Sequence, residues 1–241
     1  MTMIRLLTIL CLAYAACVPA SAADAQAGQQ AEVKFSEAET RMWMTDHLRS
    51  LTQPLTLHYE FHKTGSLEPE FNFDDKVELK IEKINADGSK SGSVQFFNGE
   101  HSFPAPPMEN STVNPVLGHY LYGDVMQMNR LTDPNGEARE RWRYFQRRIK
   151  FALADAADVK AVTFDFDGRA RQGYEISFTP YLKDPKRNLF EKFAHKRYTV
   201  TVSDELPGYL YRIETTVPDA KPEQPPLIHE VLQLTAAKPA G

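Results

Sequence analysis

The chain has 241 residues, of which 42% are hydrophobic and 25% charged, and its formal net charge is −4. This length and composition are typical of one globular domain with its own core, and the acidic balance argues against a dedicated nucleic-acid binder. Both cysteines, Cys11 and Cys17, precede residue 23, so a chain cleaved there can contain neither a disulfide nor a cysteine nucleophile.

The first residues predict an export signal. Arg5 is followed by an apolar run, Leu6–Val18, and by small residues that end at Ala22, where a signal peptidase would cut. The run is shorter than the ~20 residues that a membrane-spanning helix needs. We therefore expect a mature protein in the bacterial periplasm. A lipid anchor on Cys17 is the alternative, but Tyr14 stands where lipoprotein signals usually have leucine.

The folded region is expected to begin near Phe35. Residues 23–34 are rich in alanine, glutamine and glycine and lack apolar periodicity, which predicts a disordered lead-in. Ser36 and Glu39 have the spacing of a capping box, in which each side chain binds the other's backbone N–H. A helix is therefore expected from there to Ser50.

Three stretches in the first half alternate apolar and polar residues: Leu55–His62, Val77–Glu82 and Gly92–Phe97. Successive side chains of a strand point to opposite faces, so each stretch predicts a strand with one buried face. Turn residues at Asn85–Ser89 join the second and third of them.

Two helices are expected in the middle of the chain. Asn114 before a proline is a typical helix start, and a second helical pattern covers residues 137–150. Apolar side chains of these helices could line a ligand pocket, although a plain hydrophobic core is the alternative role. The candidates are Tyr120, Leu121, Met128, Leu131, Trp142 and Phe145.

A central hairpin is expected from two strands, Val162–Phe166 and Tyr174–Phe178, each apolar at its even-numbered positions. A two-residue turn would pair even positions with odd ones and deny the two strands a common buried face. We therefore expect a five-residue loop, Asp167–Arg171, that sets Phe164 against Tyr174.

The last part of the chain predicts a short helix, Asp184–Ala194, with Leu189 turned inward. Alternating stretches then predict three further strands, at Tyr198–Val202, Tyr209–Val217 and Leu227–Leu234.

Alternating strands favour an antiparallel sheet with one packed and one solvated face. The expected fold class is α+β: a curved, half-barrel-like antiparallel sheet with an N-terminal helix and two mid-chain helices packed on one face. The domain organisation that follows is an export signal at 1–22, the lead-in, one domain at 35–235 and a flexible tail at 236–241.

One histidine cluster could carry chemistry. His58, Glu60 and His62 share the polar face of a predicted strand. The two histidines lie ~13 Å apart at ~3.3 Å per residue, too far for both to reach one zinc ion. His58 and Glu60 could still supply two ligands, although a solvated face is the preferred interpretation. No nucleophile elbow, phosphate loop or dinucleotide motif is present, so no catalytic residue, metal site or cofactor is predicted.

Residues 137–150 carry six basic and two acidic side chains within an acidic chain. Such a helix could contact anionic lipid head groups or an acidic partner, and the candidate contact residues are Arg139, Arg143, Arg147 and Lys150. The alternative is a core helix whose arginines pair with the chain's own carboxylates.

Two motifs resemble those of exported proteins of Gram-negative bacteria. They are His-Lys-Thr-Gly-Ser-Leu-Glu-Pro at 62–69 and Tyr-Leu-Lys-Asp-Pro at 181–185. This resemblance implies export and supplies no activity. The expected order of elements is also similar to that of periplasmic lipoprotein carriers, with a leading helix, a curved half-barrel and interior helices. That similarity covers most of the mature chain.

The leading hypothesis is a non-catalytic periplasmic protein that binds an apolar or amphiphilic ligand, such as a lipid, between the sheet and the mid-chain helices. One alternative is a periplasmic hydrolase or metal-dependent enzyme centred on His58 and Glu60. The other is an envelope interaction protein that uses the basic helix at 137–150.

Overall fold

The computed structural model describes residues 34–133, 135–137 and 140–239. The described fold belongs to a compact unit that begins at Phe35. The predicted export signal and nearly all of the predicted lead-in lie outside the described residues. Within the described residues, no helix combines the length and the hydropathy needed to cross a membrane.

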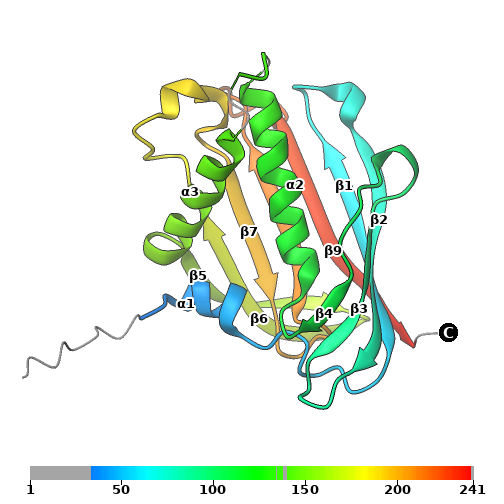
Figure 1. The fold of residues 1–241 in the computed structure, drawn as a ribbon. Helices are drawn as coiled ribbons and strands as arrows, with labels where there is room; N and C mark the ends of the chain where they lie inside the picture. The colour runs from blue at the N-terminus through cyan, green and yellow to red at the C-terminus, as the bar shows by residue number, and fades with distance from the viewer. Residues whose placement is uncertain (1–33, 134, 138–139, 240–241) are drawn as a thin grey trace, which may run out of the picture. The chain divides into compact units, whose positions relative to one another are not determined.

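The described residues form one antiparallel sheet of nine strands. In chain order they are β1 (Leu55–Thr64), β2 (Phe73–Ile84), β3 (Lys90–Phe96), β4 (Met108–Ser111), β5 (Asp158–Phe166), β6 (Arg169–Phe178), β7 (Arg197–Val202), β8 (Leu210–Val217) and β9 (Ile228–Pro239). They lie side by side in the order β4-β3-β2-β1-β9-β8-β7-β6-β5. The pairing of β1 with β9 therefore holds the two halves of the sheet together (Figure 1).

Three helical segments of the described chain lie on one face of this sheet (Figure 1). They are α1 (Glu37–Glu39) with its π-turn continuation η1 (Thr40–Met44), α2 (Pro115–Thr132) and α3 (Arg141–Asp155). Short 3-10 turns lie in the connections: η2 (Pro69–Phe71), η3 (Gly99–His101), η4 (Arg187–Leu189) and η5 (Glu191–Phe193). Helix α3 packs against α2 and α1. The predicted α+β class is confirmed.

The start of α2 is fixed by Asn114, as the sequence predicts. Its Oδ1 accepts a hydrogen bond from the backbone N–H of Val116 at 3.1 Å, which is the N-cap contact. Its Nδ2 donates to Tyr59 Oη at 2.9 Å and to the Gly208 carbonyl at 2.8 Å. His47 Nδ1 accepts from the Asn114 backbone N–H at 3.2 Å. These contacts tie α2 to the sheet and to the segment after η1.

The unfolding free energy is expected to fall at acidic pH because buried His47 must stay neutral. Burial lowers the pKa of His47, against smaller opposing effects of the Arg41 carbonyl and of Asp46. The folded state then binds fewer protons than the unfolded chain, whose histidines titrate near ~6.5. The stability gained by keeping His47 neutral is therefore fully present above pH ~6.5. It is lost as the pH falls below that value, by at most ~1.4 kcal/mol per pH unit for one histidine.

Urea unfolding of His47→Gln, followed from neutral to mildly acidic pH, should show a flatter pH dependence than the wild type. His195→Gln is the control, because its side chain is exposed and its replacement should leave the wild-type slope unchanged. A His47→Gln protein with the full wild-type slope would contradict this prediction.

The predicted register of the central hairpin is wrong. The structure has a two-residue turn, Asp167-Gly168, with φ values of 53° and 67°, and it sets Phe164 opposite Arg171. Both positive φ values suit the type I′ turn that matches the twist of a hairpin. Phe164 lies on the face away from the helices, where its ring stacks on Tyr211 at 4.0 Å. The aromatic contact there removes the need for a common buried face.

Two helices differ from the predictions. The first ends at Met44, before Ser50, because Thr45 is extended with ψ 138°. The predicted helix at 184–194 is replaced by the turns η4 and η5, and Leu189 is 56% exposed instead of inward. With three residues per 3-10 turn, side chains three apart share a face, and Phe190 and Phe193 are the buried pair.

The predicted flexible tail is wrong for residues 236–239. These residues continue β9, where Ala236 pairs with His58 and Pro239 with Leu55. Residues 237–239 of this strand are exposed. They therefore lack the alternation of apolar and polar residues from which a strand could be predicted. Residues 240–241 lie outside the described residues.

Candidate functional site

An aromatic hollow of about 250 Å³ lies between α2 and the strands β1, β2, β3 and β9. Its walls include five phenylalanines: Phe61, Phe73, Phe96, Phe97 and Phe103. Tyr120, Gly123, Asp124 and Gln127 of α2 form one side, and Lys63 and Glu230 lie at the polar end. We refer to this space as the aromatic hollow.

The register of the central strands brings these side chains together. Alternate residues of β1 are buried, so Phe61 and Lys63 point to the helix-covered face. Lys63 lies opposite Phe73 of β2 on one side and opposite Glu230 of β9 on the other. One row across three strands therefore supplies an aromatic wall, a cation and an anion.

The loop after β3 adds further rings through an unusual backbone. Phe97 has φ 62°, a left-handed conformation that costs roughly 1–2 kcal/mol for a residue with a side chain. Its ring centroid lies 4.7 Å from that of Phe61 and 5.4 Å from that of Phe73. His101 stacks on Phe73 at 3.9 Å. The strained backbone of this loop thus places aromatic rings over the hollow.

Glu230 is the centre of the polar end. It is 5% exposed, and its carboxylate lies 3.2 Å from Lys63 Nζ. Tyr120 Oη and Gln127 Nε2 each donate to it at 3.1 Å. Burial alone would raise the pKa of Glu230, but the charges of Lys196 and Lys63 outweigh burial, so the pKa is lowered. Glu230 is therefore ionised at neutral pH.

A second buried ion pair lies beside Glu230. Lys196 is fully buried and donates to Asp124 Oδ1, and Tyr198 Oη donates to Asp124 Oδ2 at 2.6 Å. Burial raises the pKa of Asp124 more than the neighbouring Lys196 lowers it. Lys63, Asp124, Lys196 and Glu230 form what we call the buried charge cluster, in which two cations balance two anions.

Two glycines in α2 leave open space on opposite sides of the helix. Gly123 lines the aromatic hollow, and Gly118 lines a second depression between α2, α3 and η1. A Cβ atom added at either position would meet nothing within 4 Å. Glycine inside a helix costs about 0.8 kcal/mol or more relative to good helix formers. Each glycine therefore destabilises α2 at a position where a larger side chain would narrow the adjacent cavity.

The second depression, which we call the helical groove, has a volume of about 530 Å³. It is lined by Phe35, Trp43, Met44, Leu121, Tyr122, Val125, Ile149 and Leu153, with Glu39, Gln146 and Lys150 at polar positions. The groove lies outside the layer formed by the sheet and α2, so it is distinct from the aromatic hollow.

The six residues predicted to line a pocket do not share one cavity. Tyr120 lines the aromatic hollow, whereas Leu121 lines the helical groove. Met128 and Phe145 have no exposed surface and belong to the core. The remaining two, Leu131 and Trp142, are half-buried against the core.

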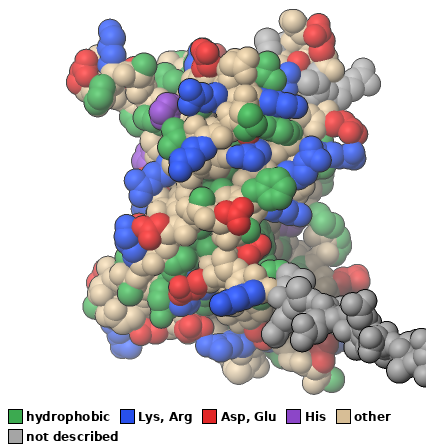
Figure 2. All heavy atoms as spheres, turned by 90° about the vertical axis from the view of Figure 1, so that its left-hand side faces the viewer, with side chains coloured by type: hydrophobic (Ala, Val, Ile, Leu, Met, Phe, Trp, Pro, Cys, Tyr) green, Lys and Arg blue, Asp and Glu red, His purple; other side chains and the backbone are tan. Residues whose placement is uncertain are grey.

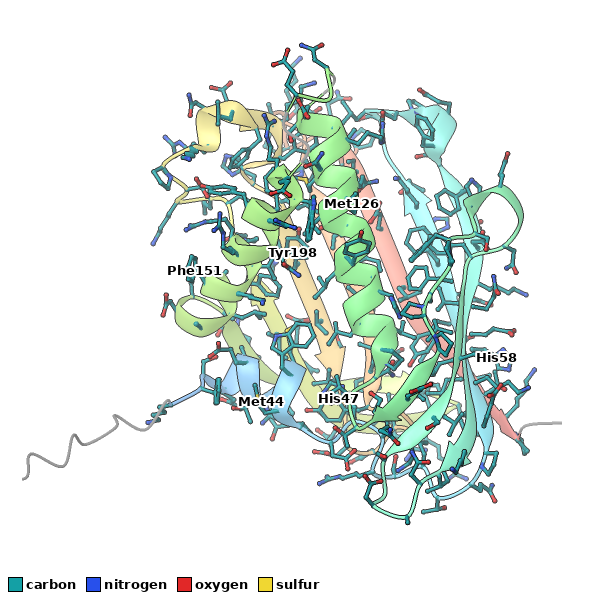
Figure 3. All side chains as sticks on the ribbon, viewed as in Figure 1. Met44, His47, His58, Met126, Phe151 and Tyr198 are labelled. Carbon is teal, nitrogen blue, oxygen red and sulfur yellow. The ribbon has the colours of Figure 1, made fainter. Side chains whose placement is uncertain are left out.

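The histidine cluster lies on the outer face of β1. His58 Nδ1 is 3.1 Å from Glu78 Oε1 of β2, and His62 contacts Asp74 in the same way, while Glu60 is exposed (His58, Figure 3). Among the described residues, no group of three histidines, cysteines or carboxylates is placed to hold a metal ion. The enzyme hypothesis centred on His58 and Glu60 therefore gains no third ligand in this part of the chain.

Three of the four predicted basic contact residues are exposed on α3: Arg143, Arg147 and Lys150. Arg143 forms an ion pair with Glu140 at 2.9 Å. Lysine and arginine side chains are spread over the side of the molecule seen in Figure 2. Arg139 lies outside the described residues.

The buried charge cluster was not predicted from the sequence. Lys63 continues the inward stripe of Tyr59 and Phe61, and Glu230 occupies the inward stripe of β9 between Ile228 and Leu232. A charged residue at an inward strand position was the available signal, because such groups are rarely buried without a partner.

No protein-family model and no curated protein matches the sequence. Two solved structures are similar in fold. The lipoprotein LppX of Mycobacterium tuberculosis has 10% identity and a TM-score of 0.34, with 86% of this chain and 99% of that chain covered. A LolA superfamily protein of Nitrosomonas europaea has 9% identity and a TM-score of 0.21, with 85% and 94% covered. At these scores neither similarity assigns a ligand or a residue.

Proposed function

We propose that the protein is a non-catalytic periplasmic binding protein that holds one amphiphilic ligand in the aromatic hollow. The apolar part of the ligand packs against the phenylalanine rings, and its polar group lies at Lys63 and Gln127. The proposal rests on one combination: the aromatic hollow has ring walls, its polar end holds the charged side chains Lys63 and Glu230, and Gly123 of α2 leaves it open.

The polar end offers both a donor and an acceptor to a ligand. Lys63 Nζ contacts Glu230 at 3.2 Å and retains N–H groups for another acceptor. Gln127 Oε1 is buried and has no hydrogen-bond partner among the described residues. A buried acceptor without a partner costs ~1–3 kcal/mol, which a ligand hydroxyl would recover. The polar group is therefore one that accepts from an ammonium and also donates, such as a hydroxyl or an undissociated acid.

The volume limits the apolar part. Small-molecule pockets usually measure ~300–1,000 Å³. The aromatic hollow, at about 250 Å³, lies just below this range. It suits an aromatic ring system or one short chain, and a phospholipid with two long chains would extend beyond it.

Gly123→Leu should weaken ligand binding strongly and leave the fold intact. The side chain of Gly123→Leu would occupy the hollow of about 250 Å³, so the affinity for the neutral fluorescent amine N-phenyl-1-naphthylamine, whose N–H can donate, should fall at least about tenfold. The melting temperature should stay equal or rise, because leucine is the better helix former by about 0.8 kcal/mol.

The matched control is Gly118→Leu, which makes the same change on the other side of α2 and should leave probe binding intact. Loss of binding in Gly118→Leu alone would assign the ligand to the helical groove and overturn the proposal. Mass spectrometry of compounds extracted from wild-type protein purified from the periplasm should then identify an amphiphile that is absent from Gly123→Leu.

A further inference from the structure

Exposed apolar side chains gather around the helical groove. The described residues include seven exposed large hydrophobic side chains: Phe35, Met44, Phe71, Tyr122, Met126, Phe151 and Leu189. Phe35, Met44 and Tyr122 line the groove, and Met126 follows Tyr122 by one helical turn on α2. Figure 3 shows Met44 near the end of η1 and Met126 on α2. Such a concentration marks a surface that contacts something other than water.

Both tryptophans of the chain border this surface. Trp43 lines the groove, and Trp142 packs edge-on against Tyr122 with ring centroids 5.9 Å apart. Both rings are half-buried. Tryptophan and tyrosine with one apolar and one wet side are typical of the boundary between lipid chains and head groups.

A cationic stripe runs along the same side of α3. Lys150 lines the groove, and Arg147 and Arg143 precede it by three and seven residues, which places all three on one helical face. The acidic group that lines the groove, Glu39, is engaged with the backbone N–H of Ser36 at 2.9 Å. Arg143 also pairs with Glu140 at 2.9 Å. The three cations of the stripe against these two carboxylates leave a local charge of +1 in a chain whose formal charge is −4.

We propose that the helical groove and this cationic stripe form a docking surface for a bilayer that contains anionic phospholipid. The apolar residues enter the acyl boundary, and the cations of α3 meet the head-group phosphates. Charge complementarity favours this occupant over a second copy of the chain, because two copies joined through the groove would bring two cationic stripes together. The surface lies on the opposite side of α2 from the aromatic hollow, so the inference does not depend on the ligand proposed there.

Co-sedimentation of the wild-type protein with vesicles of phosphatidylglycerol and phosphatidylcholine tests the docking surface. The protein should bind these vesicles, and its tryptophan fluorescence should shift to shorter wavelength, since both tryptophans border the surface. The double reversal Arg147→Glu/Lys150→Glu should weaken binding about thirtyfold or more. Lys76→Glu/Lys83→Glu changes the charge equally on exposed positions of β2 and should bind like the wild type.

Met44→Ser/Met126→Ser, which leaves the cationic stripe of α3 unchanged, should also reduce binding to the anionic vesicles. Equal loss in both charge reversals, equal binding to vesicles of phosphatidylcholine alone, or no binding would each overturn the proposal. A dimer in light scattering that Tyr122→Ser converts to a monomer would assign the surface to a second copy and would also overturn it.

Discussion

Asp124→Leu is expected to lower the unfolding free energy by about 3–5 kcal/mol. The substitution would leave the Lys196 ammonium, which is fully buried, without its carboxylate partner. Removal of one partner of a buried ion pair is far more costly than removal of both. Tyr198 Oη would also lose the acceptor that it binds at 2.6 Å.

The double variant Asp124→Leu/Lys196→Met is the decisive control. It replaces both charges by apolar side chains and should be much more stable than the single variant, with an unfolding free energy equal to that of the wild type or up to about 4 kcal/mol higher. Urea unfolding of the three proteins at neutral pH measures the difference. A double variant as unstable as Asp124→Leu would show that the loss comes from packing and not from the unpaired ammonium.

Phe145→Ala should also lower the unfolding free energy, by about 3–5 kcal/mol. The ring has no exposed surface, and it meets Tyr181 and Phe190 edge-to-face at centroid distances of 5.3 and 5.4 Å. Its removal opens a cavity between α3 and the segment that contains η4 and η5. The edge-to-face contacts add ~0.5–1.5 kcal/mol to the loss of buried area.

The same substitution six residues later supplies a matched control. Phe151 is on α3 but is 55% exposed, so Phe151→Ala should change the unfolding free energy by no more than about 0.5 kcal/mol. Urea unfolding compares the two variants directly. Similar losses in both would contradict the prediction, because the cost would then not follow from the burial of Phe145 between α3 and the segment that contains η4 and η5.

The sequence predicts well what depends on neighbouring residues. The inward stripe of Leu57, Tyr59 and Phe61 follows from strand periodicity alone. The capping contacts of Asn114 with Val116 depend on residues two positions apart. For the same reason the α+β class and the helix-covered face could be predicted without coordinates.

The rest depends on contacts between distant residues. The hairpin register follows from the stacking of Phe164 on Tyr211 of β8, which no pattern in the hairpin reveals. Lys63 meets Glu230 only because β9 returns beside β1. The aromatic hollow is likewise formed by a loop, a helix and the central strands together. Periodicity within one segment predicts which of its side chains point inward, but not which segments meet around one cavity.

The place of β9 in the sheet bears on aggregation. The last strand of the described residues, β9 (Ile228–Pro239), fills the central position between β1 and β8. A chain truncated before Ile228 would retain two four-stranded halves, each with a bare edge that can pair with another polypeptide. Chains that lack β9 are thus the species that chaperones and proteases would have to intercept, while a chain that includes β9 covers both exposed strand edges in one step.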